Sequence, residues 1–155
     1  MIPRSKGQSI MEMEQYPKMY LYRRIVQAKL FIDRHYAENI DLEKIADEAY
    51  FSKFHFSRLF KKAYGKTPHH YLTQVRIDNA RQLLTQGVPV AEVSCRIGFD
   101  SSTSFAALFK KRYGVSPSCY QARQLQKRIS FAENPLQAIP NCFAETHGWK
   151  KSNIQ

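Results

Sequence analysis

The stretch "FSRLFKKAYGKTPHHY", residues 56–71, and the stretch "FAALFKKRYGVSPSCY", residues 105–120, decide the fold. Nine of the sixteen aligned positions are identical, and the second stretch follows the first by 49 residues. In each stretch apolar residues recur three and four positions apart, and a glycine follows, which predicts an amphipathic helix that ends at the glycine. A chain that carries the same basic and aromatic helix twice is expected to contain two copies of one structural unit.

Patterns before each stretch complete the repeated unit. "LEKIADEA", residues 42–49, predicts a short helix that Asp41 caps, and "VAEVSCRI", residues 90–97, predicts its counterpart. Ser52 and Ser101 are the expected N-caps of the helices that follow. Each unit therefore consists of a short helix, a tight turn and a second helix, which is a helix-turn-helix. The offset between the copies changes from 48 to 49 residues at the turn, so the second turn is one residue longer.

A long helix is expected to join the two units. Pro68 begins it, and Gly87 and Pro89 end it after about Gln86. The expected fold class is all-α, with about seven helices, including a last short helix from Pro117 to about Leu125. The expected organisation is a flexible leader at residues 1–19, a first helix-turn-helix subdomain at 20–67, a linker helix at 68–86, a second helix-turn-helix subdomain at 87–125 and a C-terminal tail at 126–155.

The charge is concentrated on the repeats. The chain carries a formal net charge of +11 and has a pI near 9.7. Between residues 50 and 123 there are 12 lysines and arginines and 3 acidic residues, which gives +9, so most of the excess lies there. A polyanionic partner explains this distribution. A basic soluble domain without a specific partner is the simpler interpretation that remains open.

Signs of other kinds of site are weak. Cys95, Cys119 and Cys142 show no paired spacing, which is typical of reduced thiols in a cytoplasmic protein. His55 and the pair His69–His70 have no carboxylate or cysteine at metal-ligand spacing. No catalytic motif is present, and no apolar run is long enough to span a membrane. We therefore expect no enzyme activity, no cofactor, no metal ion and no membrane partner.

The helix after Ser52 has two distinct faces. The apolar residues at helical spacing are expected to pack inward; they are Phe56, Leu59, Phe60 and Ala63. The opposite face carries Phe54, Ser57, Arg58 and Lys61. Such a face is suited to the major groove, which admits one helix and where an arginine fork matches guanine. A solvated basic face is the simpler alternative, although an exposed aromatic residue favours a partner.

The corresponding helix of the second unit differs at its outward face. Its inward positions are Phe105, Leu108, Phe109 and Arg112. Ala106 and Ala107 stand where the first helix has Ser57 and Arg58, and alanine offers only a methyl group to a base. We therefore expect the first helix to make most of the hydrogen-bonded base contacts. The predicted DNA-binding residues are Ser52, Lys53, Phe54, His55, Ser57, Arg58, Lys61, Lys62, Ser101, Ser102, Thr103, Ala106, Ala107, Lys110 and Lys111.

Residues 21–125 resemble the AraC/XylS family of bacterial transcription regulators. The motifs that carry the resemblance are "IGF" before the second turn, "FKKRYGVSP" after it and "R-DNARQLL" in the long helix. The resemblance implies two homeodomain-like helix-turn-helix units that occupy adjacent major grooves on one face of double-stranded DNA. It implies the stand-alone form without a sensor domain. The Ala106–Ala107 pair departs from the more polar sequence that is common in the second recognition helix.

The resemblance also implies a function and partners. The chain is expected to be a sequence-specific activator in the bacterial cytoplasm, at the nucleoid, that binds DNA as a monomer and contacts RNA polymerase. Two other classes remain open. One is an architectural DNA-binding protein with little sequence preference, and the other is a module whose basic face binds an acidic protein.

Overall fold

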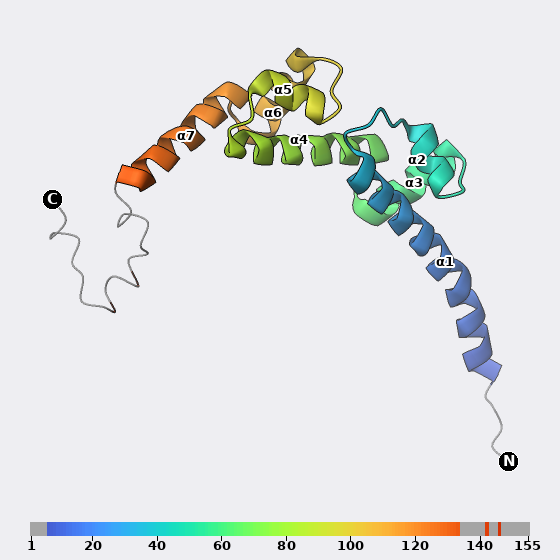
Figure 1. The fold of residues 1–155 in the computed structure, drawn as a ribbon. Coiled ribbons are helices and arrows are strands. Elements are labelled where there is room, and N and C mark those ends of the chain that lie inside the picture. Colours follow the sequence, from blue (N-terminus) through green and yellow to red (C-terminus); the bar gives the residue numbers. More distant parts are fainter. Residues whose placement is uncertain (1–5, 134–141, 143–145, 147–155) are drawn as a thin grey trace.

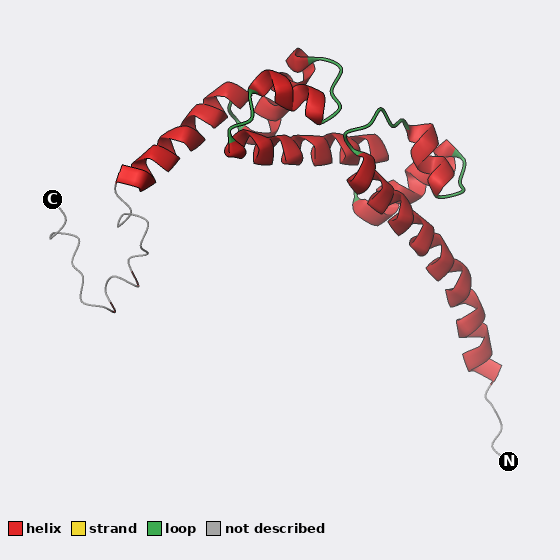
Figure 2. Ribbon diagram, in the orientation of Figure 1, coloured by secondary structure: helices red, strands yellow, loops and turns green. Residues whose placement is uncertain are grey.

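The computed structural model describes residues 6–133, Cys142 and Thr146, with side chains from residue 19 onward. Seven helices and no strand occur between residues 6 and 133 (Figures 1 and 2). The helices are α1 (Lys6–His35), α2 (Leu42–Glu48), α3 (Lys53–Tyr64), α4 (Pro68–Gln86), α5 (Val90–Arg96), α6 (Ser102–Tyr113) and α7 (Pro117–Glu133). The predicted all-α class with two helix-turn-helix units is confirmed, since α2–α3 and α5–α6 form the two units.

Local signals place the helix starts. The Asp41 side chain accepts a hydrogen bond from the backbone N–H of Lys44 at 2.9 Å, as an N-cap does. Ser101 accepts in the same way from the N–H of Ser104 at 3.3 Å, whereas Ser52 holds the N-cap position of α3 without a side-chain bond. The predicted bounds of α4 are confirmed at both ends.

The repeated aromatic residues form two matching cores. Phe60 lies at ring-centroid distances of 4.7 Å from Tyr64 and 5.6 Å from Tyr71. The corresponding distances from Phe109 to Tyr113 and Tyr120 are 4.8 and 5.5 Å. The sequence that residues 56–71 and 105–120 share therefore produces the same packing of aromatic rings in both units.

The helix α4 lies between the two cores and packs against all six other helices. Leu72 belongs to the first core, and Ile77, Ala80 and Leu84 belong to the second. Tyr36, at the end of α1, packs against both. Figure 1 shows α4 running between the α2–α3 unit and the α5–α6 unit, with α1 and α7 extending away on opposite sides. The linker is thus a packed part of the fold, not a spacer.

Two tyrosine–aspartate hydrogen bonds attach α4 to its neighbours. The hydroxyl of Tyr71 on α4 donates to Asp33 of α1 at 2.9 Å, and the hydroxyl of Tyr113 on α6 donates to Asp78 of α4 at 2.6 Å. Burial is the largest cause that raises the pKa of both tyrosines, and the hydrogen bond to the carboxylate raises it further. Both tyrosines therefore remain protonated donors near neutral pH.

The structure differs from the expectations at the two ends. The helix α1 begins at Lys6, so residues 6–19 are helical where a leader without regular structure was expected. The helix α7 continues to Glu133, beyond the expected end near Leu125 and into the expected tail. The rest of that tail lies outside the described residues, apart from Cys142 and Thr146. The subdomain boundaries stay a prediction.

Two residues expected to point inward are exposed. Ala63 lies near the end of α3, and Arg112 lies near the end of α6. A guanidinium nitrogen of Arg112 lies 3.5 Å from a carboxylate oxygen of Asp78, at the surface. The fully buried residues are therefore Phe56 and Phe60 on α3 and Phe105 and Phe109 on α6. Leu59 and Leu108 are half-buried beside them.

Candidate nucleic-acid interface

The outward faces of α3 and α6 carry the residues predicted to bind DNA. On α3 the side chain of Phe54 is 76% exposed, on the face opposite Phe56 and Phe60, which are fully buried. Arg58 is exposed and Ser57 is half-buried. Also exposed at the start and along this face are Ser52, Lys53, His55, Lys61 and Lys62. The predicted division of α3 into a buried and an exposed face is therefore confirmed for these residues.

The helix α6 has the same division with different chemistry. Phe105 and Phe109 are fully buried, Ala106 is half-buried and Ala107 is exposed. The other exposed residues predicted for this face are Ser101, Ser102, Thr103, Lys110 and Lys111. The exposed middle of α6 is thus a methyl surface that polar and cationic side chains flank.

Among the described residues, most cations of these two faces have no carboxylate partner. Within the described part of the chain, no ion pair or hydrogen bond forms at the side chains of Arg58, Lys61, Lys62, Lys110 and Lys111. Lys53 is the exception, since its ammonium lies 4.0 Å from the exposed carboxylate of Glu43. Unneutralised cations that share a face with donors and an aromatic ring form an electrostatic footprint for a polyanion.

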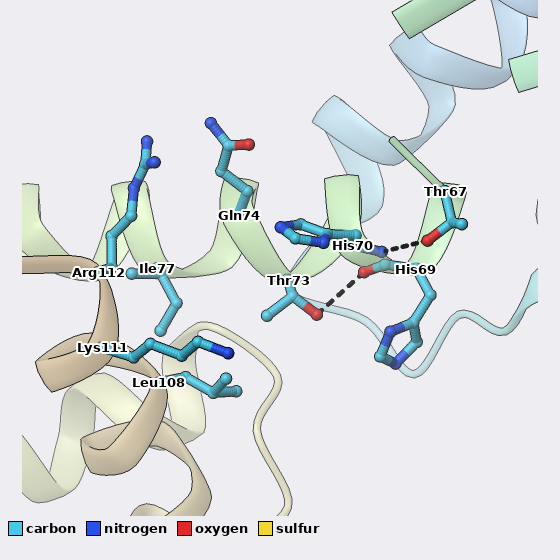
Figure 3. A pocket seen from close by; sticks show the side chains of 9 residues that line it. All are labelled: Thr67, His69, His70, Thr73, Gln74, Ile77, Leu108, Lys111 and Arg112. Carbon is cyan, nitrogen blue, oxygen red and sulfur yellow. Dashed lines mark hydrogen bonds between the residues drawn. The ribbon is translucent and has the colours of Figure 1, made fainter. Parts of the chain in front are cut away.

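A hollow of about 510 Å³ lies between α4 and α6. Figure 3 shows His69 and His70 on its α4 side and Leu108 and Lys111 on its α6 side. The backbone N–H of His70 is held by the Thr67 hydroxyl at 3.3 Å, which caps α4. No pattern in the sequence indicates that residues 67–77 and 108–112 meet, because only the packing of α6 onto α4 brings them together. The residues that line the hollow are Thr67, His69, His70, Thr73, Gln74, Ile77, Leu108, Lys111 and Arg112.

The described residues do not form a metal centre. Among them, no group of three or more histidines, cysteines, aspartates and glutamates lies close enough to hold an ion. Cys95, Cys119 and Cys142 are exposed free thiols. No helix between residues 6 and 133 combines the length and the apolar character that crossing a bilayer requires.

Comparisons with known proteins agree with this geometry. A family model described as a helix-turn-helix domain matches residues 45–123, about half of the chain. The transcriptional activator AarP of Providencia stuartii is 32% identical over 98 residues, which cover 63% of this chain and 73% of AarP. The chain belongs to the AraC/XylS family of transcription regulators.

The chain spans only part of the length of several other relatives. The transcriptional regulator YbfI of Bacillus subtilis is 37% identical over 73 residues, which cover 47% of this chain and 26% of YbfI. The DNA-binding domain of the global transcriptional factor AdpA, solved in complex with a target DNA, superposes with a TM-score of 0.62 at 30% identity. That match covers 72% of this chain and 96% of the AdpA domain. This chain accordingly contains an AraC-type DNA-binding domain of the kind found in transcription regulators.

Proposed function

We propose that the chain is a sequence-specific transcription activator that inserts α3 and α6 into adjacent major grooves on one face of a DNA duplex. The observation that carries the proposal is the pair of exposed helix faces, each opposite two buried phenylalanines and each bearing cations without carboxylate partners. The 19 residues of α4 span about 28 Å at 1.5 Å per residue. That length suits two units that read half-sites about one helical turn, or roughly 34 Å, apart.

The two recognition helices have different roles in this proposal. Arg58, with Ser57 beside it and Phe54 one turn earlier, supplies base contacts from α3, because a guanidinium pairs with guanine O6 and N7. Ala106 and Ala107 fit closely against the groove and touch thymine methyl groups. Lys110 and Lys111 contact phosphates, as do the backbone N–H groups at the start of α6, which Ser101, Ser102 and Thr103 surround. On α3 the phosphate contacts come from Ser52, Lys53, His55, Lys61 and Lys62.

The remaining elements of the proposal concern the cellular role. The protein acts in the bacterial cytoplasm, at the nucleoid, binds its operator as a monomer and contacts RNA polymerase. The name of AarP, an activator, supports the sign of regulation. The two alanines of α6 favour a second candidate, an architectural DNA-binding protein with little sequence preference.

Selection of bound duplexes from a random pool at near-physiological salt separates the two candidates. A sequence-specific regulator enriches a motif with two half-sites, and the half-site read by α3 contains a guanine. An architectural protein enriches no motif, and that outcome would contradict the proposal.

Lys110→Ala and Lys111→Ala are each expected to weaken binding to the selected operator and to random DNA by similar factors. When a lysine binds a phosphate, counterions are released from the DNA. Removing one such lysine therefore makes the plot of log affinity against log salt concentration less steep, by about 0.9. Titrations at several salt concentrations measure this slope. Arg96→Ala is the control, because Arg96 lies on α5 and is already paired with Glu92. Unchanged slopes for both lysine variants would remove these lysines from the interface.

A further inference from the structure

Outside α4, the second helix-turn-helix unit contacts the loop that leads from α1 into the first unit. Gly98, in the turn between α5 and α6, has φ of +73° and lies against the loop between α1 and α2. A Cβ atom at this position would lie 2.6 Å from the carbonyl oxygen of Ala37 and 2.9 Å from its carbon. Figure 1 shows the two loops side by side next to α4. The backbone of one unit is therefore in contact with the backbone at the entry to the other.

Arg76 of α4 binds the same loop. Its Nε donates a hydrogen bond to the carbonyl of Tyr36 at 2.6 Å, and its Nη2 donates to the carbonyl of Glu38 at 2.8 Å. Its guanidinium carbon lies 5.9 Å from the centre of the Phe99 ring, next to Gly98 in the second turn. Burial lowers the pKa of Arg76, and the nearby carboxylate of Asp100 partly offsets this effect. One side chain thus links α4, the first unit and the second turn.

The first unit shows why position 98 is a glycine. Tyr50 holds the corresponding place in the first turn with φ of +55°, and the N–H of the next residue closes both turns with an equivalent bond. The bonds run from Phe51 to the carbonyl of Ala46 and from Phe99 to the carbonyl of Ser94, both at 3.1 Å. Tyr50 is 77% exposed, so its turn tolerates a side chain. What sets Gly98 apart is the close approach of Ala37, not the shape of the turn.

We propose that this junction, made of Arg76, Gly98 and the backbone of residues 36–38, sets the distance and rotation between α3 and α6. It thereby determines which spacing of half-sites the protein accepts. This inference rests on the proposed binding of both helices to one duplex. One added base pair moves the second half-site by roughly 3.4 Å and turns it by about 35°. Two units held at a fixed distance and rotation cannot both bind the altered half-sites, whereas two units that can move relative to each other can.

Gly98→Ala and Gly114→Ala form a matched pair that tests the junction. Both glycines have left-handed backbones, with φ of +73° and +77°, so alanine strains both positions alike. A Cβ at Gly114 meets nothing within 4 Å, whereas a Cβ at Gly98 pushes against Ala37. Arg76→Lys is a second variant, since it keeps the charge but loses the planar fork that reaches two carbonyls. Thermal unfolding shows which variants are folded.

Each folded protein is titrated with the selected operator and with the same duplex carrying one base pair more or less between its half-sites. The parent should lose at least roughly tenfold in affinity with each altered duplex, which is part of the 10²–10⁴-fold gain that linked binding units supply. Gly114→Ala should keep this preference for spacing. Gly98→Ala and Arg76→Lys should bind the selected operator more weakly and should lose most of the preference.

The outcomes distinguish a failure of the proposed role of the junction from a failure of the two-groove binding mode on which that role depends. If the parent prefers one spacing and the folded junction variants keep the same preference as Gly114→Ala, the junction does not set the spacing. If Gly98→Ala does not fold, Arg76→Lys alone decides between these results. A parent that binds all spacings equally would instead overturn the two-groove mode of binding, and the role of the junction with it.

Discussion

Replacing Phe60 or Phe109 with alanine is expected to lower the free energy of unfolding by about 3–5 kcal/mol. Each ring is fully buried and contacts a phenylalanine and two tyrosines of its own core. Removing it takes apolar surface from the core and leaves a cavity, and both effects destabilise. Because small domains are stable by only about 5–15 kcal/mol, either variant is expected to melt far below the parent.

Denaturant and thermal unfolding measure this effect, and Phe54→Ala is the matched control. Phe54 lies on the same helix as Phe60 but is 76% exposed, so its removal should change stability by less than about 0.5 kcal/mol. Phe54→Ala and Phe60→Ala thus distinguish an effect on DNA binding from an effect on stability. A Phe60→Ala protein as stable as the parent would mean that α3 presents its other face to the core.

Replacing Arg58 with alanine is expected to weaken binding to the selected operator by about 1–3 kcal/mol, or roughly 5- to 150-fold. An arginine that donates two hydrogen bonds to one guanine accounts for a loss of this size. The preference at one or two base pairs should relax at the same time. On scrambled DNA the loss should be smaller, because only the attraction of the charge to phosphates disappears.

Ala107→Leu is the counterpart on α6. Alanine at this exposed position donates no hydrogen bond, so the expected effect of a larger side chain is steric. Leucine should push α6 out of the groove and weaken binding to operator and scrambled DNA alike. The proposed roles of the two helices would be wrong if Arg58→Ala lost the same factor on both duplexes while Ala107→Leu changed the preferred sequence.

The sequence predicted the middle of the fold well because the signals there are local. The cap at Asp41, the proline that begins α4 and the glycines after α3, α4 and α6 each act within one turn of helix. The spacing of Phe56 and Phe60 alone was enough to find the buried face of α3. The exposed face could be found by the same reasoning, since it is simply the other side.

The sequence predicted the ends of the fold poorly. Residues 6–19 and 126–133 lack a sustained apolar period, yet they continue α1 and α7. A helix that already packs along part of its length extends at little further cost, because the nucleation of its first turn has been overcome. Ala63 and Arg112 were expected inside because they share the helical spacing of the buried residues. They lie in the last turns of α3 and α6, where the adjacent tyrosines, Tyr64 and Tyr113, pack against the cores instead.

The junction could not be predicted, because it joins residues far apart in the chain. Arg76 reaches carbonyl groups 38 and 40 residues away, and no periodicity connects them. One signal was present in the alignment of the repeats, since Gly98 stands where the first copy has Tyr50. That difference indicates a close approach only once the structure shows what lies opposite.

The contrast between Tyr50 and Gly98 bears on how such a chain can be re-engineered. The two units look like copies, and a chimera with two first units or with the order of the units reversed would be an obvious design. Either design brings a tyrosine to the turn that faces Ala37, where even a single Cβ has no room. One unit therefore cannot simply replace the other. At this turn the first unit has room for a tyrosine side chain, whereas the second unit has room only for a hydrogen atom, so each unit fits its own place in the chain.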